Sequence, residues 1–141
     1  MRVRDALSTA PLASPPIVVA GRTTLAALYI ASAGVHCVLV ATNPESYRQF
    51  ADRAVIPFVE TAWHDVFMSD PEAWGLTVAL VEVLLASALL MGGGLRRLGY
   101  AGVIAFNLAL TLFGWGFWLW SAPALLLIVP LALADGLLRH P

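Results

Sequence analysis

The chain has 141 residues, of which 60% are hydrophobic and only 12% are charged, and its mean hydropathy is +0.81. This composition is typical of an integral membrane protein and excludes an ordinary soluble domain. The formal net charge of −1 excludes the clustered basic surface that nucleic-acid binding requires, and the single cysteine excludes an intrachain disulfide.

The first 22 residues precede the first apolar run. They include Pro11, Pro15 and Pro16 and lack the apolar stretch of a cleavable signal peptide. We therefore expect a short cytoplasmic tail over residues 1–22, followed by a transmembrane domain over residues 23–141.

Four apolar segments follow, each close to the ~20 residues that a helix needs to cross a bilayer. They cover residues 23–41, 73–91, 98–118 and 122–138. The predicted fold is all-α, an integral membrane four-helix bundle. Asp70-Pro71 predicts the start of the second span, and Ser121 with Pro123 predicts the start of the fourth, because proline lacks the amide hydrogen left unpaired in a first helical turn.

The outer segment, residues 42–72, separates the first two spans. Residues 43–57 predict an amphipathic helix with Asn43 as its N-cap and Pro44 in its first turn. Its apolar residues follow helical spacing along one face: Tyr47, Phe50, Ala51, Ala54, Val55 and Phe58. Such a helix lies on the outer membrane surface or on the end of the bundle, or it acts as a lid over a site that opens outward.

Arginine placement predicts the orientation, because arginines favour the cytoplasmic side. With both termini inside, the cytoplasmic segments hold Arg2, Arg4, Arg22, Arg96, Arg97 and Arg139, whereas the outer segment holds only Arg48 and Arg53. We therefore expect a multi-pass protein of the cell membrane with a cytoplasmic N-terminus and C-terminus.

Two ionisable side chains lie deep in the predicted spans, His36 in the first and Glu82 in the second. Ionisable groups inside a bilayer are costly and point to function. At a rise of ~1.5 Å per residue, His36 lies ~9 Å and Glu82 ~15 Å below the outer boundary. The two side chains span that offset, so we predict that they pair and handle protons.

Polar and small side chains form one stripe on each of three spans. Tyr29, Ser32, Ala33 and His36 share a face of the first, Gly75, Ala79, Glu82 and Ala86 of the second, and Tyr100, Asn107, Thr111 and Gly114 of the third. Because hydrocarbon offers polar groups no partners, we expect the three stripes to meet. We predict that Tyr29, Asn107, Thr111 and Trp115 line a cofactor site, with Asn107 donating to a carbonyl.

Three uses of this polar cluster are open: a hydrogen-bond network that fixes helix packing, a site for a quinone or other small redox substrate, and a path for protons or a solute. Haem and metal are not expected, because His64 and His140 lie outside the spans and His36 and Glu82 are the only deep ligands. His64 and Asp65 form a secondary candidate pair, which would relay protons to His36 if the outer helix is a lid.

The residues Leu28 to His36 in the first span, with the sequence LYIASAGVH, resemble the DoxX-like family of small four-helix bacterial membrane proteins. So does the second span, where Glu82 lies in an apolar helix that ends at Gly92 and is followed by Arg96 and Arg97. The resemblance implies a four-helix bundle of the bacterial inner membrane associated with redox chemistry. Relatives include the membrane subunit of thiosulfate:quinone oxidoreductase. The lone cysteine, Cys37, argues against a self-contained thiol oxidoreductase.

We therefore expect a redox-associated membrane subunit that supports quinone-linked electron transfer with a partner protein, alone or as an oligomer. The alternatives are a structural scaffold or anchor without catalysis, and a transporter of protons or a small solute. Against the transporter, neither inverted halves nor a pair of broken helices is visible in the sequence.

Overall fold

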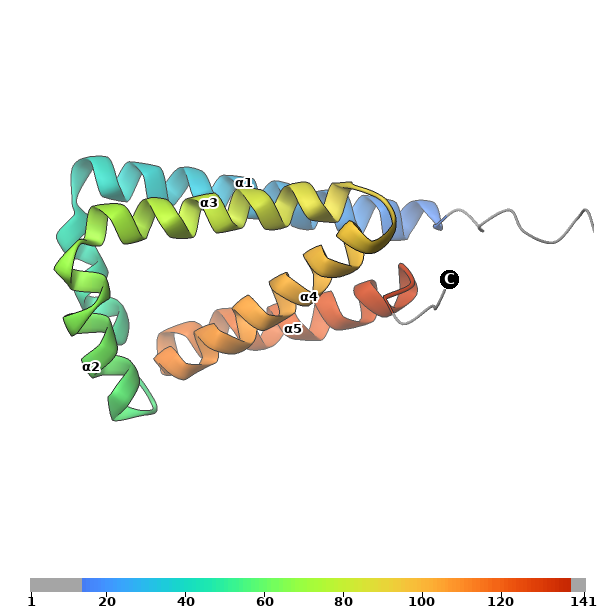
Figure 1. The fold of residues 1–141 in the computed structure, drawn as a ribbon. Helices are drawn as coiled ribbons and strands as arrows, with labels where there is room; N and C mark the ends of the chain where they lie inside the picture. Colours follow the sequence, from blue (N-terminus) through green and yellow to red (C-terminus); the bar gives the residue numbers. More distant parts are fainter. Residues whose placement is uncertain (1–13, 138–141) are drawn as a thin grey trace, which may run out of the picture.

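The computed structural model describes residues 14–137, and this part of the chain is all-α (Figure 1). Its elements in chain order are α1 (Pro16–Thr42), η2 (Pro44–Ala51), α2 (Pro57–Asp65), η3 (Phe67–Ser69), α3 (Pro71–Leu90), α4 (Gly93–Leu110), η4 (Thr111–Phe113) and α5 (Trp115–Ala134), where η denotes a 3₁₀ helix. Three of them, α1, α3 and α5, are long and apolar enough to cross a membrane. The chain is therefore a small all-helical protein of the multi-pass membrane class.

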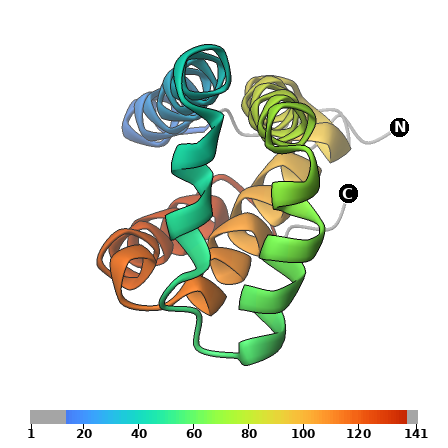
Figure 2. The same cartoon turned by 90° about the vertical axis from the view of Figure 1, so that its left-hand side faces the viewer.

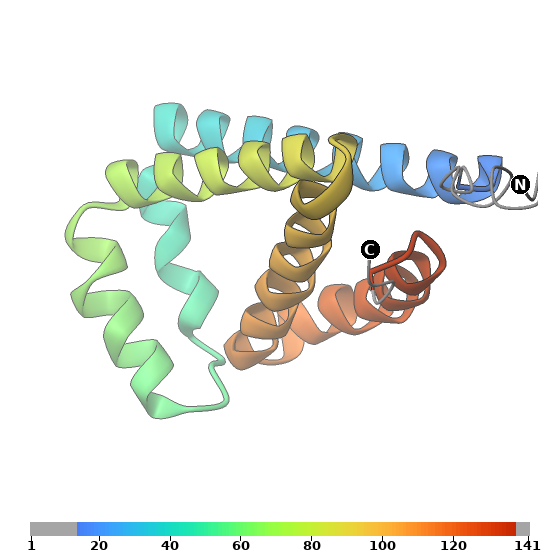
Figure 3. The same ribbon diagram turned by 45° about the vertical axis from the view of Figure 1, so that its right-hand side comes forward.

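Helices α1 and α3 lie side by side along most of their length (Figures 1 and 3). The predicted small-residue stripe makes this possible, because Gly75, Ala79 and Ala86 are all buried. A Cβ atom on Gly75 would lie only 2.6 Å from a methyl carbon of Val40 on α1. Helix α3 starts where the sequence predicts, since the carboxylate of Asp70 accepts a hydrogen bond from the amide of Ala73 at 3.0 Å.

Helix α1 starts at Pro16, well before the predicted span at residue 23. Arg22 was expected to end the cytoplasmic tail, but it is buried inside the helix. Its Nη1 atom donates a hydrogen bond of 2.7 Å to Oδ2 of Asp135, which follows α5. The Asp135 carboxylate takes the place of the water that would otherwise solvate the Arg22 guanidinium. The charged residue can therefore lie inside the helix. Arg2 and Arg4 lie outside the described residues.

The predicted third and fourth spans have the wrong boundaries, because the chain turns at Gly114 rather than near residue 120. Helix α4 ends at Leu110, and Gly114 has a φ of 86°, which favours glycine. A Cβ atom there would lie 1.8 Å from the carbonyl oxygen of Arg53. The three tryptophans predicted at the end of the third span, Trp115, Trp118 and Trp120, therefore belong to the first turns of α5.

The segment between α1 and α3, residues 43–70, is called the cap segment here. It is not one amphipathic helix, because η2 ends at Ala51 and α2 starts afresh at Pro57. The Asn43 side chain makes no capping hydrogen bond. Tyr47 and Ala51 are buried as predicted, whereas Val55 and Phe58, beyond the break in the helical pattern, are exposed.

The cap segment crosses one end of the four long helices (Figure 2). At its near side it packs on α1 and α3, and at its far side the amide of Val55 donates to the carbonyl of Leu112 at 2.9 Å. The α1–α3 pair and the α4–α5 pair are thus held apart at the cap end and converge toward the other end (Figures 1 and 3).

At the convergent end, the carboxylate of Asp135 is fully buried and ties three helices together. It accepts hydrogen bonds from Ser14 at 2.5 Å, from Arg22 at 2.7 Å and from Tyr100 at 3.1 Å, and Nη1 of Arg96 lies 3.6 Å away. An apolar core surrounds Tyr100 at this end, and a second one surrounds Tyr47 under the cap segment. The space between the two cores is where polar side chains gather.

Candidate functional site

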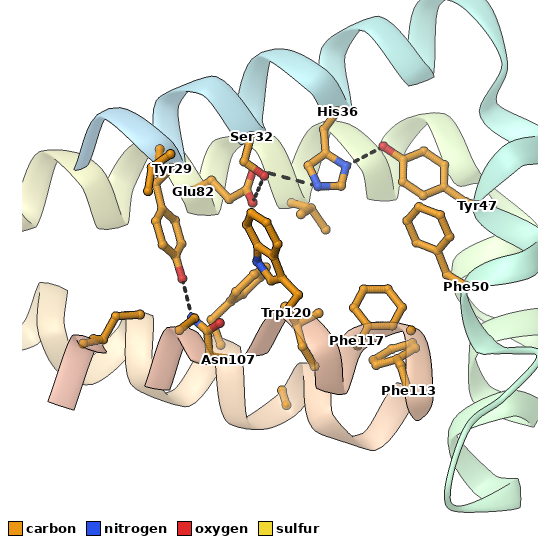
Figure 4. Close-up of a pocket in the computed structure, with 18 of the residues that line it drawn as sticks. Tyr29, Ser32, His36, Tyr47, Phe50, Glu82, Asn107, Phe113, Phe117 and Trp120 are labelled. Atoms are coloured by element: carbon orange, nitrogen blue, oxygen red, sulfur yellow. Dashed lines mark hydrogen bonds and ion pairs between the residues drawn. The ribbon is translucent and has the colours of Figure 1, made fainter. Parts of the chain in front are cut away.

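A cavity of about 530 Å³ lies between the two cores, bounded by α1, α3, α4, α5 and the cap segment (Figure 4). Its walls are mainly aromatic and aliphatic, with aromatic side chains from every wall except α3: Tyr29, Tyr47, Phe50, Trp63, Phe67, Phe106, Phe113, Phe117 and Trp120. Its size and its apolar lining with a few polar groups match a small-molecule binding site.

Glu82 supplies the carboxylate of this cavity. The side chain comes from the buried stripe of α3 and is 2% exposed. Its Oε1 atom accepts a hydrogen bond of 2.7 Å from Ser32 of α1, whereas its buried Oε2 atom has no hydrogen-bond partner. Nε2 of His36 lies 3.9 Å from this Oε2 atom, a distance that is too long for a hydrogen bond. The structure thus brings the side chains of His36 and Glu82 close together and leaves Oε2 of Glu82 without a hydrogen bond.

His36 connects Glu82 to the cap segment. Its Nδ1 atom and the Tyr47 hydroxyl are 2.7 Å apart, and which of them donates depends on the imidazole tautomer. Tyr47 is fully buried, and Trp63 of α2 donates to its backbone carbonyl at 2.8 Å. Burial raises the pKa of Tyr47 above its ordinary value, with the nearby Glu82 carboxylate adding to the effect. Glu82, His36 and Tyr47 therefore form a line of proton-bearing groups from the cavity to the cap.

Asn107 of α4 and Tyr29 of α1 face each other across the cavity. The Asn107 amide nitrogen donates to the Tyr29 hydroxyl at 2.9 Å and to the backbone carbonyl of Val103 at 3.0 Å. Both predicted residues line the cavity, as expected from their stripes. Because the amide hydrogens already have partners, a donation from Asn107 to a ligand would replace its bond to Tyr29.

Four of the predicted site residues lie elsewhere. Thr111 of η4 donates to the carbonyl of Leu108 in α4, and Trp115 is 64% exposed and packs on Trp118. His64 and Asp65 end α2, and neither lines the cavity. Trp63, their neighbour in sequence, does line it.

The sequence reasoning missed Tyr47 and most of the aromatic wall as site residues. Phe113 and Phe117 flank the turn at Gly114, and Tyr47 and Phe50 are three residues apart, a spacing of one helical face. That spacing indicates that the side chains of Tyr47 and Phe50 share one surface. It did not reveal that the cap segment and the α4–α5 turn meet, with Phe50 and Phe117 in edge-to-face contact at 5.8 Å.

Within residues 14–137, no three His, Cys, Asp or Glu side chains gather as they would to hold a metal ion. Comparison of the chain with protein-family models, with curated proteins and with solved structures gives no match. The fold and its hydropathy define a small multi-pass membrane protein with a largely apolar cavity between its helices.

Proposed function

We propose that the protein crosses the membrane four times, with α4 as a span beside α1, α3 and α5. Helix α4 has 18 residues, and at 1.5 Å per residue it is ~27 Å long, close to the ~30 Å thickness of a hydrocarbon core. Arg96, Arg97 and Asn107 lower its hydropathy, but Arg96 lies near the buried Asp135 and Asn107 is buried against Tyr29. Arg96 and Asn107 thus have partners inside the bundle, and Arg97 lies only four residues after the start of α4 at Gly93.

We propose that the cap segment faces the outside and the convergent end faces the cytoplasm of the cell. Arg22, Arg96 and Arg97 belong to the convergent end, whereas the cap segment carries Arg48 and Arg53, with Arg48 neutralised by Glu45 at 2.8 Å. This distribution follows the positive-inside tendency.

We further propose that the cavity binds a quinone and that the protein is a membrane subunit supporting a partner oxidoreductase, the role that the resemblance to the DoxX-like family implies. The observation that carries this proposal is the unbonded Oε2 atom of Glu82, buried in the wall of an aromatic cavity. A buried carboxylate oxygen without a partner is costly, so a ligand that supplies a hydroxyl or shares a proton there would be bound favourably.

The remaining lining suits the same ligand. A planar ring suits the aromatic lining, because contact with aromatic faces adds to the energy of its burial. Glu82 and His36 provide polar atoms nearer the cap segment, and Asn107 and Tyr29 provide polar atoms farther from it (Figure 4). Two separate polar positions in an apolar pocket match a ring with two oxygen atoms.

A bound quinone supplies the redox chemistry, accepting two electrons and two protons to become a quinol. The electrons come from the partner oxidoreductase. The chain's own residues bind the ring, exclude water and deliver protons. Glu82 would exchange a proton with the ring at Oε2, His36 lies 3.9 Å from that atom, and the Tyr47 hydroxyl links His36 to the cap segment.

The test is to purify the protein, extract its bound quinone and measure the amount per chain. The variants Glu82→Gln and His36→Ala are expected to lose at least about tenfold in quinone affinity, the loss of ~1.4 kcal/mol of binding free energy. The control Glu72→Gln changes an exposed carboxylate on the same helix and is expected to bind normally. Normal quinone binding by both cavity variants, or none by the wild type, contradicts the proposal.

The same variants separate this proposal from a structural role. Glu82→Gln keeps the shape of the side chain and removes a buried charge, so we expect its free energy of unfolding to equal or exceed that of the wild type. A loss of several kcal/mol without any effect on quinone binding would instead identify Glu82 as part of a packing network.

A further inference from the structure

The edge of the cavity lies between α1 and α5. Among the large side chains that line the cavity, two are well exposed, Leu28 on α1 at 55% and Trp120 on α5 at 66%. Both helices are candidate membrane spans. An opening between them therefore faces hydrocarbon and not water.

Contacts close this opening at both ends. Toward the convergent end, α1 and α5 touch where a Cβ atom on Gly21 would lie 3.0 Å from a methyl carbon of Leu131. Toward the cap, Phe50 meets Phe117 with ring centroids 5.8 Å apart. Between these contacts, Figure 4 shows the Trp120 indole directed from α5 toward α1.

On the opposite side, α3 and α4 pack closely near the convergent end. A Cβ atom on Gly99 would lie 2.7 Å from the amide nitrogen of Leu89, and one on Gly102 would lie 2.4 Å from a methyl carbon of Leu85. The α1–α5 side is thus the side where bulky lining residues reach the surface.

Polarity changes from the edge of the cavity to its interior. Leu28 and Trp120 at the edge present apolar surface, whereas Glu82 and Asn107 are almost fully buried. A ligand that matches this gradient has a polar head and an apolar tail, with the head inward. The indole N–H of Trp120 is the one hydrogen-bond donor of these two edge side chains.

We propose that the cavity opens sideways into the bilayer between α1 and α5, with Trp120 as its gate, and that its ligand is a long-tailed quinone whose tail stays in this opening. This inference rests on the quinone binding proposed above. The ring lies between the aromatic walls near Glu82, and the tail passes between Leu28 and Trp120 into the hydrocarbon.

The test compares two probes on the purified protein in lipid nanodiscs, a benzoquinone with a ten-carbon tail and the same ring without a tail. Leu28→Trp narrows the opening and is expected to weaken binding of the tailed probe about tenfold while changing that of the tailless probe less than about twofold. The control Leu126→Trp adds the same side chain at an exposed position of α5 that does not line the cavity, and it is expected to bind both probes normally.

Trp120→Ala provides a second variant that removes bulk instead of adding it. It is expected to release the tailed probe several times faster than the wild type, because the gate no longer covers the opening. The lateral opening is overturned if Leu28→Trp affects both probes equally, or if neither variant affects the tailed probe. Binding by the wild type would still support the quinone site in that case. A wild type that binds neither probe overturns both proposals.

Discussion

Tyr47 holds His36 by a hydroxyl-to-Nδ1 distance of 2.7 Å while the two rings lie nearly parallel, with an angle of 3° between their planes. One residue comes from the cap segment and the other from α1, so the imidazole is oriented by a segment outside the predicted spans. This contact fixes which ring nitrogen faces Glu82.

Tyr47→Phe tests that contact, because it removes the hydroxyl and keeps the ring packing. We expect the free energy of unfolding to fall by about 0.5–1.5 kcal/mol, the usual net value of one hydrogen bond. The ¹⁵N chemical shifts of His36 should move as the tautomer balance changes. Trp63→Phe, which removes the hydrogen bond to the backbone of Tyr47, is the control and should leave those shifts closer to the wild type. Unchanged shifts in Tyr47→Phe would contradict the orienting role.

Asp135→Asn tests the polar cluster at the convergent end. The substitution leaves Arg22 buried without its counter-charge, so we expect a loss of about 3–5 kcal/mol in the free energy of unfolding. Asp52→Asn, on the exposed surface of the cap segment, should change stability by less than about 0.5 kcal/mol. Both are measured by denaturant titration in detergent. A similarly small effect at Asp135 would mean that water solvates Arg22.

Gly114→Ala tests the turn between α4 and α5. The positive φ alone is expected to cost about 1–3 kcal/mol, and the close carbonyl of Arg53 forces the cap segment to move as well. The control is Gly34→Ala, in the middle of α1 with no atom within 4 Å of the added carbon. It should raise stability by about 0.5–1 kcal/mol. Melting curves that order the two variants the other way would contradict this account.

Single cysteines test the number of spans and the orientation. In a Cys37→Ser background, Glu60→Cys reports the cap segment, Gly92→Cys the turn from α3 to α4, and Gly116→Cys the start of α5. With four spans, a membrane-impermeant maleimide added to intact cells should label positions 60 and 116. Position 92 should react only after permeabilisation. Labelling of position 116 together with position 92 would mean that α4 does not cross the membrane.

The sequence predicts α3 well because its signals are local. Asp70 and Pro71 start the helix, a long run interrupted in its middle by Glu82 but otherwise mainly apolar follows, and glycines come directly after it. The boundary between α4 and α5 was missed because apolar and aromatic residues continue through the turn. The only local sign is Gly114, whose positive φ depends on its close contact with Arg53.

Long-range contacts explain the other errors. Arg22 reads as a span boundary because a lone charge is costly in a bilayer, and its partner Asp135 lies 113 residues away in sequence. His36 and Glu82 were predicted because ionisable residues in apolar helices are conspicuous. Tyr47 was not, because its contact with His36 forms only when the cap segment folds back over the bundle.

The cap segment is bonded to α1 through Tyr47 and His36, and to the α4–α5 turn through Val55 and Leu112. The cap segment therefore acts as a spacer between the α1–α3 pair and the α4–α5 pair. Its length sets the angle at which they diverge, and with that angle the width of the space between them. Shortening the cap segment would therefore shrink the cavity without altering any residue of the long helices, and lengthening it would enlarge the cavity.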